Sequence, residues 1–170
     1  MTEERARITV HVKYKDVEKI LSGNIEEVWL LLNRFFTELL PSFEIARKLT
    51  LNVDLQALAK DIENVIAFAE EGQYLLVQRN KLTDNETLAL LLLANYVGRQ
   101  LGKTQSDGLS KEELQSKLGK DSKITSTRLG ELVKSEIVMK TADDKYKITT
   151  FGIAQIQKDI LPRIKARIGT

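Results

Sequence analysis

The chain of 170 residues contains no cysteine, a single histidine and only two prolines. The absence of cysteine excludes disulfide scaffolds, thiol nucleophiles, iron–sulfur clusters and every zinc site with a cysteine ligand. The single histidine, His11, leaves no histidine pair for a catalytic metal, and its position among alternating polar residues is typical of a protein surface. We therefore expect no metal site and no cofactor.

Signatures of catalysis are also missing. The sequence has no Gly-x-Ser-x-Gly elbow, no phosphate-binding loop and no Gly-x-Gly-x-x-Gly motif. The acidic pairs Glu26-Glu27 and Glu70-Glu71 are explained by the first turn of a helix and by a solvated turn. Because no group of residues supplies a nucleophile, a base and an orienting residue together, we expect that the protein is not an enzyme.

No segment of the sequence indicates secretion or a membrane. Residues 1–10 lack the basic stretch and apolar run of a signal peptide. The most apolar stretch, residues 88–97, is about half as long as the roughly 20 residues that cross a bilayer. We therefore expect a cytoplasmic protein without a membrane partner.

The charge balance differs between the two halves of the chain. In total, 26 basic residues face 24 acidic ones, which gives a net charge of +2. Residues 1–81 hold 11 basic and 13 acidic residues, whereas residues 82–170 hold 15 and 11. The second half is therefore modestly basic, which permits a nucleic-acid partner without requiring one.

The residue pattern of the first half predicts an α+β domain. Apolar and polar residues alternate over 8–14, and a turn at residues 15–16 predicts a β-hairpin with residues 17–21. Helices are expected over about 24–40, 43–51 and 54–62, followed by a second hairpin around Gly72. Most of the aromatic residues are expected in the core, with a partner surface or ligand pocket as the alternative: Trp29, Phe35, Phe36 and Phe43. We assign residues 1–81 to one domain with a role in assembly or sensing.

The second half has the element order of a winged helix-turn-helix. An almost wholly apolar helix follows the capping box of Thr83 and Glu86, and it is expected at the centre of the fold or of a dimer. Two further helices, over 110–118 and 123–135, precede strands over 137–141 and 145–149. A C-terminal helix ends the chain. The predicted fold class is therefore α+β, with a hairpin and helix domain followed by a winged-helix domain over 82–170.

Two segments carry a family resemblance. The run from Ser126 to Val138, with Arg128 and the core positions Leu129 and Leu132, is followed by Tyr146-Lys147-Ile148-Thr149-Thr150-Phe151-Gly152. Together they resemble the recognition helix and wing of MarR- and ArsR-like winged-helix regulators, and the resemblance covers residues 82–168. It implies binding to double-stranded DNA and regulation of transcription, with one helix in the major groove and the wing beside the backbone.

The candidate DNA-binding residues surround the second helix of this motif. Leu129, Leu132 and Val133 are expected on its buried face, and Gly130 suggests close approach of a backbone or another helix. Donors to phosphates and bases then lie outward or on the flanks. The predicted DNA-binding set consists of Lys120, Lys123, Ser126, Thr127, Arg128, Glu131, Lys134, Lys140, Lys145 and Lys147.

Three acidic residues favour an alternative function. Glu131 lies among the groove-facing residues, where it would accept from a cytosine amino group or pair with Lys123 or Lys134. Asp143 and Asp144 occupy the expected tip of the wing, where they would repel phosphates. A winged-helix module that binds another protein, rather than DNA, is therefore the second hypothesis.

An apolar stripe along the C-terminal helix predicts a dimer. Its members repeat at three- and four-residue steps: Ile153, Ile156, Ile160, Leu161, Ile164 and Ile168. Packing onto the rest of the same domain and pairing with a second copy both explain this spacing. Pro162 removes one helical hydrogen bond and is expected to kink this helix. A homodimer that contacts DNA, with a possible protein partner for residues 1–81, is the resulting hypothesis.

Overall fold

The computed structural model describes residues 7–39 and 49–169, and the chain forms two compact units. Unit 1 is Met1–Thr50 and unit 2 is Leu51–Thr170. Each sheet in the described part is a two-stranded antiparallel hairpin, and helices make up most of the rest. The predicted α+β class is confirmed.

Unit 1 consists of a hairpin and one helix. Strands β1 (Ile8–Tyr14) and β2 (Val17–Gly23) pair as predicted, with Lys15 at a positive φ of 52° in the turn. Helix α1 (Ile25–Leu39) packs on the hairpin and begins at a reciprocal cap between Asn24 and Glu27. The fully buried apolar side chains described in this unit are Leu21, Val28 and Phe35. The predicted helix over 43–51 falls largely outside the described residues.

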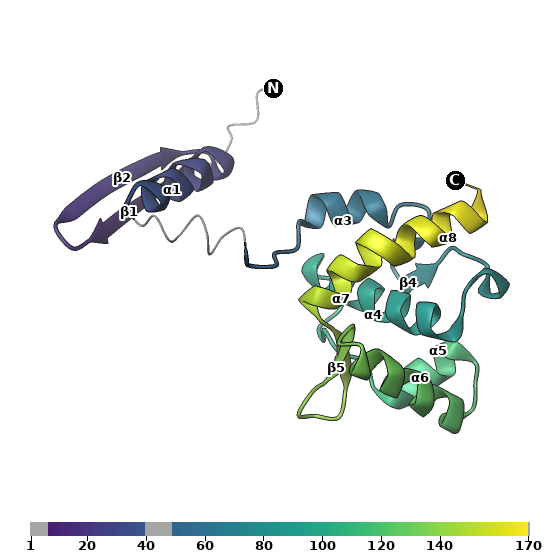
Figure 1. Ribbon diagram of the computed structural model, residues 1–170. Helices are drawn as coiled ribbons and strands as arrows, with labels where there is room; N and C mark the ends of the chain where they lie inside the picture. The colour runs from purple at the N-terminus through teal and green to yellow at the C-terminus, as the bar shows by residue number, and fades with distance from the viewer. Residues whose placement is uncertain (1–6, 40–48, 170) are drawn as a thin grey trace. The chain divides into compact units, whose positions relative to one another are not determined.

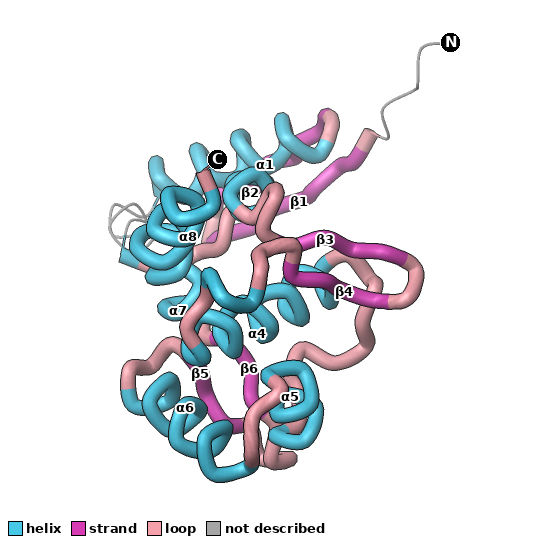
Figure 2. Tube along the Cα trace, turned by 90° about the vertical axis from the view of Figure 1, so that its right-hand side faces the viewer, coloured by secondary structure: helices cyan, strands magenta, loops and turns pink. Residues whose placement is uncertain are grey.

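Helix α4 (Asp84–Gln100) lies at the centre of unit 2 (Figures 1 and 2). Its residues from Thr87 to Asn95 are all buried, and it contacts α5, α6, β3, β4 and β6. The predicted capping box is present, because Thr83 accepts from the Glu86 amide while Glu86 accepts from the Thr83 amide. A helix that is apolar on every side needs partners on every side, and here they come from its own unit.

The boundary between the units lies at residues 50/51, not at the predicted 81/82. Helix α3 (Leu55–Asp61), the hairpin of β3 (Ile66–Ala69) and β4 (Gly72–Leu75), and the short helix η1 (Arg79–Lys81) all belong to unit 2. Their apolar residues join the α4 leucines in one core: Leu58, Ile62, Val65, Ile66 and Val77. Sequence spacing alone did not show that α4 needs these residues as a cover.

Two helices and a hairpin follow α4 in the predicted order. Helix α5 (Lys111–Leu118) ends at Gly119, which has a left-handed φ of 67°, and α6 (Ser122–Lys134) begins three residues later. Strands β5 (Val138–Lys140) and β6 (Tyr146–Ile148) form an antiparallel hairpin. In Figure 1, α5 and α6 lie below α4.

The C-terminal stripe is part of the core of unit 2 rather than a free surface. The chain continues from α7 (Thr150–Gln155) through the π-helical segment η2 (Ile156–Ile160) into α8 (Leu161–Ile168). Four of the predicted dimerisation residues are no more than 1% exposed: Ile153, Ile156, Leu161 and Ile164. Ile160 and Ile168 are half-buried against the same core. The prediction that this stripe binds a second copy is therefore corrected, since α4 needs the same side chains as its cover.

The π-helical segment ends two residues before Pro162. The amide of Leu161 donates to the carbonyl oxygen of Ile156, five residues earlier, where an α-helix would use the fourth. Proline has no amide hydrogen to donate, so a local change in the hydrogen-bond ladder at this place is the expected response.

Two glycines in helices have opposite surroundings. A Cβ atom on Gly152 would lie 2.1 Å from the carbonyl oxygen of Ile137, so only glycine fits where α7 passes the start of the hairpin. A Cβ atom on Gly130, in the middle of α6, would meet no atom within 4 Å. The suggestion that another part of this chain approaches Gly130 is therefore corrected.

We expect the two glycine-to-alanine variants to shift stability in opposite directions. Gly152→Ala should lower the free energy of unfolding by about 1–3 kcal/mol, because the added methyl group overlaps backbone. Gly130→Ala should raise it by about 0.5–1 kcal/mol, because alanine restricts the unfolded chain more than glycine does. Urea unfolding followed by circular dichroism measures both. Equal shifts in the two variants would contradict the described packing.

Arg167 links α8 to the beginning of α4 through hydrogen bonds. Its guanidinium donates to the Glu86 carboxylate and, over 2.9 Å, to the carbonyl oxygen of Lys81. Burial opposes ionisation of Glu86, but the hydrogen bonds from Arg167 and Thr83 outweigh it and hold the pKa of Glu86 below its ordinary value. The ion pair therefore links the C-terminal helix to the capping box of α4.

We expect Arg167→Gln to lower the free energy of unfolding at pH 7 by about 0.5–1 kcal/mol, the value of a partly exposed ion pair. A lowered carboxyl pKa stabilises the folded state above the unfolded-state value and loses this effect as the pH falls through the folded-state pKa. The difference from the natural sequence should therefore shrink below about pH 4.5. Arg163→Gln, on the same helix, is the control, because Arg163 donates to a neighbouring carbonyl oxygen of its own helix. Thermal unfolding of the variant and of the natural sequence, at pH 7 and below about pH 4.5, measures this difference in stability. A difference in stability that persists at the lower pH would count against this ion pair.

Candidate nucleic-acid interface

Helix α6 has one buried face and one exposed polar face. Leu129 and Leu132 are buried as predicted, and Thr125 joins them. Val133, which was expected with them, is 37% exposed, because it lies at the edge of the buried face. The outward side carries small or basic residues, all exposed: Lys123, Ser126, Thr127, Gly130 and Lys134. This side therefore presents hydrogen-bond donors and two lysines to solvent.

Glu131 is held at the edge of α6 that faces α4. Its carboxylate accepts from Arg128 Nη1 at 3.0 and 3.1 Å and from Asn85 Nδ2 at 2.8 Å. These hydrogen bonds, that of Asn85 foremost, lower the pKa of Glu131. Its bonded partners are therefore Arg128 and Asn85, not Lys123 or Lys134 as one of the sequence-based alternatives had it. Glu131 and Arg128 therefore form a bridge between α6 and α4, and their charges offset each other.

A second bridge joins η1, α4 and the end of α5. Arg79 donates to Thr87 Oγ1 at 2.6 Å, to Asp84 Oδ1 at 2.8 Å and to the carbonyl oxygen of Leu118 at 3.3 Å. Arg128 Nε lies 4.0 Å from Asp84 Oδ2, which connects this bridge to the first. Sequence reasoning missed Arg79, Asp84 and Asn85 because their partners lie as many as 46 residues away. The position of Asp84 and Asn85 at the first turn of a buried helix was the available signal.

The predicted lysines of the hairpin all have acidic neighbours. Lys140 Nζ lies 2.7 Å from Asp144, Lys145 Nζ lies 3.8 Å from Asp143, and Lys147 Nζ lies 3.4 Å from Asp107. Hydrogen bonding from Thr141 lowers the pKa of Asp143, and the Asp144 carboxylate raises the pKa of Lys140. The hairpin tip is therefore close to neutral in charge, although three of its residues are lysines.

The ten predicted DNA-binding residues thus divide into three groups. Four lie together on the outward side of α6, with Lys120 exposed in the turn before it: Lys123, Ser126, Thr127 and Lys134. Arg128 and Glu131 are bound to each other at the edge toward α4. Lys140, Lys145 and Lys147 are paired with aspartates.

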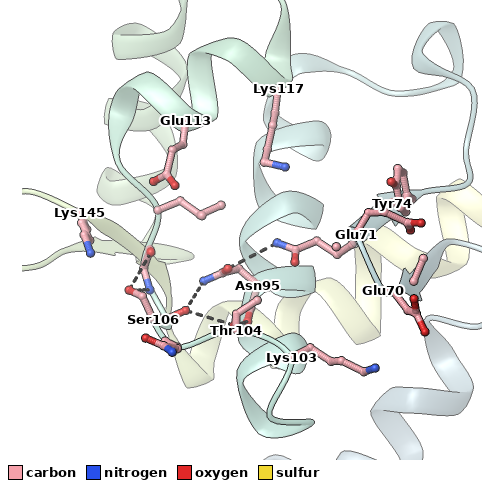
Figure 3. Close-up of a pocket in the computed structure, with 16 residues that line it drawn as sticks. Glu70, Glu71, Tyr74, Asn95, Lys103, Thr104, Ser106, Glu113, Lys117 and Lys145 are labelled. Carbon is pink, nitrogen blue, oxygen red and sulfur yellow. Dashed lines mark hydrogen bonds between the residues drawn. The ribbon is translucent and has the colours of Figure 1, made fainter.

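A polar cavity of about 570 Å³ lies elsewhere in unit 2, beside α4 (Figure 3). The buried Asn95 is at its centre, with Lys103 and Lys117 on either side. Asn95 Nδ2 donates to the carbonyl oxygen of Ser106 at 2.9 Å, and its Oδ1 accepts from Gln73 at 3.4 Å. The Asn95 amide thus connects the β3–β4 hairpin to the loop before α5, with both its nitrogen and its oxygen hydrogen-bonded within the chain.

The chain matches no known protein family, no curated protein and no solved structure. Within residues 7–39 and 49–169, no three histidine, cysteine, aspartate or glutamate side chains gather as a metal site would need. None of the helices in these ranges combines the length and the apolar character needed to cross a bilayer.

Proposed function

We propose that unit 2 is a winged-helix DNA-binding module and that the protein regulates transcription. Helix α6 is the recognition helix, α5 is the helix that precedes it, and the β5–β6 hairpin is the wing. The observation that carries the proposal is the outward side of α6, where Lys123 and Lys134 are exposed and Glu131, the nearby acidic residue of the helix, is bonded to Arg128 and Asn85 instead. A 13-residue helix is about 20 Å long and fits the major groove.

The fixed position of Glu131 supports this function. Glu131 is the single acidic residue between Ser122 and Lys134, and it is bonded to Arg128 and Asn85 at the edge toward α4. The charge that would repel phosphates is therefore compensated within the protein. Lys123, Ser126 and Thr127 at the first turns of α6 are left as donors to base edges and phosphates.

The wing contributes less to binding than its three lysines suggest. Each lysine forms an exposed ion pair with an aspartate, and such a pair is worth about 0–1 kcal/mol. A phosphate replaces the aspartate as a partner at little net gain, so most of the electrostatic affinity comes from α6 and the turn before it.

We expect opposite effects from removing a lysine of α6 and an aspartate of the wing. Lys134→Ala should weaken binding to duplex DNA and reduce the slope of log K against log salt by about one, because one phosphate contact is lost. Asp144→Asn should strengthen binding, because Lys140 is then available to the backbone. Fluorescence anisotropy with a labelled duplex over a salt series measures both.

Lys158→Ala is the matched control for the lysine variant. It removes the same charge from an exposed residue of η2, outside α6 and the hairpin, and should leave the salt slope unchanged. An equal loss of DNA affinity in Lys134→Ala and Lys158→Ala would indicate that binding depends on the total charge of the protein and not on α6. No binding to duplex DNA at about 50 mM salt would refute the proposed function.

The second candidate function is a winged-helix module that binds a protein. The near-neutral hairpin tip favours it, since the carboxylates of Asp143 and Asp144 lie beside Lys145 and Lys140. In a pull-down, a protein partner that stays bound after nuclease treatment supports this function. The Lys134→Ala variant should retain this partner as well as the natural sequence does. Retention that disappears with nuclease would instead support DNA binding.

A further inference from the structure

The polar cavity beside α4 is walled by three segments of unit 2: the β3–β4 hairpin, the loop over 103–109 and helix α5. Its volume of about 570 Å³ lies within the range of roughly 300–1,000 Å³ that is usual for small-molecule sites. Asn95, which is 3% exposed, joins the first two walls, since it donates to Ser106 of the loop and accepts from Gln73 of the hairpin. Hydrogen bonds within the chain therefore build the floor of the cavity before any ligand arrives.

Charges of both signs line this cavity in equal number. They are three lysines and three glutamates: Lys103, Lys117, Lys145, Glu70, Glu71 and Glu113. Two of the six are engaged within the chain, because Lys145 Nζ lies 3.8 Å from Asp143 and Glu113 accepts from the Ser110 amide at 2.7 Å. The other four form no ion pair with any residue that the structure describes. Two cations and two carboxylates are therefore available to a ligand.

The available charges come from different walls of the cavity. Lys103 lies in the loop after α4, and Lys117 extends from α5 toward the buried Asn95 (Figure 3). Glu70 and Glu71 occupy the turn between β3 and β4. A ligand with one sign of charge would meet two like charges in this cavity, whereas a molecule that carries both signs finds a partner for each. The lining therefore favours a ligand with separate positive and negative groups and no net charge.

We infer that this cavity binds a zwitterionic small molecule, namely a free α-amino acid with a polar side chain. The lysines take its carboxylate, and the glutamates of the hairpin turn take its ammonium group. The floor takes its side chain: Gln73 uses one N–H for its bond to Asn95 at 3.4 Å, which leaves the Gln73 carbonyl oxygen and a second N–H for a ligand amide or hydroxyl. This inference does not depend on DNA binding.

The experiment titrates the full-length protein with glutamine, asparagine, serine and threonine as free amino acids. Nitrogen-15 NMR follows the side-chain amide signals of Asn95 and Gln73, which report on the floor of the cavity directly, and calorimetry gives the dissociation constants. Two analogues of glutamine each lack one charge: 4-aminobutanamide has no carboxylate, and glutaramic acid has no amino group. We expect at least glutamine to bind with a dissociation constant of about 1 mM or lower, and both analogues to bind about fivefold more weakly or worse.

Charge-removing variants test which residues hold which end of the ligand. Lys117→Gln should weaken glutamine binding about fivefold and leave 4-aminobutanamide unaffected, because that analogue has no carboxylate. Glu70→Gln combined with Glu71→Gln should weaken glutamine to a similar extent and leave glutaramic acid unaffected. Lys111→Gln and Glu112→Gln are the matched controls, because both residues lie on α5 outside the cavity lining. Circular dichroism compares the folding of every variant with that of the natural sequence.

Three results would overturn the inference. The first is that none of the four amino acids, at about 10 mM, shifts the side-chain signals of Asn95 and Gln73. The second is that one of the singly charged analogues binds as tightly as glutamine, which would mean that the two signs of charge are not read together. The third is an equal loss of glutamine affinity in Lys117→Gln and Lys111→Gln. DNA binding is measured without amino acids, so failure of one proposal is distinguishable from failure of the other.

Discussion

The burial of α4 is the constraint on which unit 2 depends. From Leu88 to Ala94 every residue is at most 6% exposed, so this helix requires apolar neighbours around its whole circumference. Residues on both sides of it in sequence supply them, from Leu58 in α3 to Ile164 in α8. This requirement explains why the unit begins near residue 51, and why the C-terminal stripe has no face left for a second copy.

The first turn of α4 then sets the orientation of the surrounding helices. Asp84 and Asn85 reach Arg79 and the bridge on α6, while Glu86 reaches Arg167 on α8. These contacts are polar and directional, whereas the leucine core is not. The apolar contacts bring the helices together, and the polar contacts at one end of α4 determine which side of α6 faces outward. The proposed DNA-binding surface is therefore a consequence of how α4 is capped.

Local patterns were enough to predict the elements but not their grouping. The hairpins and the capping box at Thr83 were predictable because each depends on residues within a few positions. The boundary at 50/51, the exposure of Trp29 and the partners of Glu131 were not, because each is decided by contacts between distant segments. Apolar residues recur at helical spacing in both α1 and α8, yet Trp29 of α1 is exposed whereas Ile164 of α8 is buried. Amphipathic spacing shows that a face needs a partner, and it does not identify the partner.

The distribution of charge limits the affinity expected of the proposed DNA-binding surface. With the hairpin lysines paired to aspartates, one copy offers Lys120, Lys123 and Lys134 as its main cations near α6. A few phosphate contacts support non-specific dissociation constants of about 10⁻⁴–10⁻⁶ M, which is weak for a regulator. Joining two such modules makes the second contact intramolecular and raises affinity by roughly 10²–10⁴ without any new contact. If unit 2 binds DNA as proposed, two copies held on one duplex would therefore gain more affinity than the paired hairpin lysines can supply.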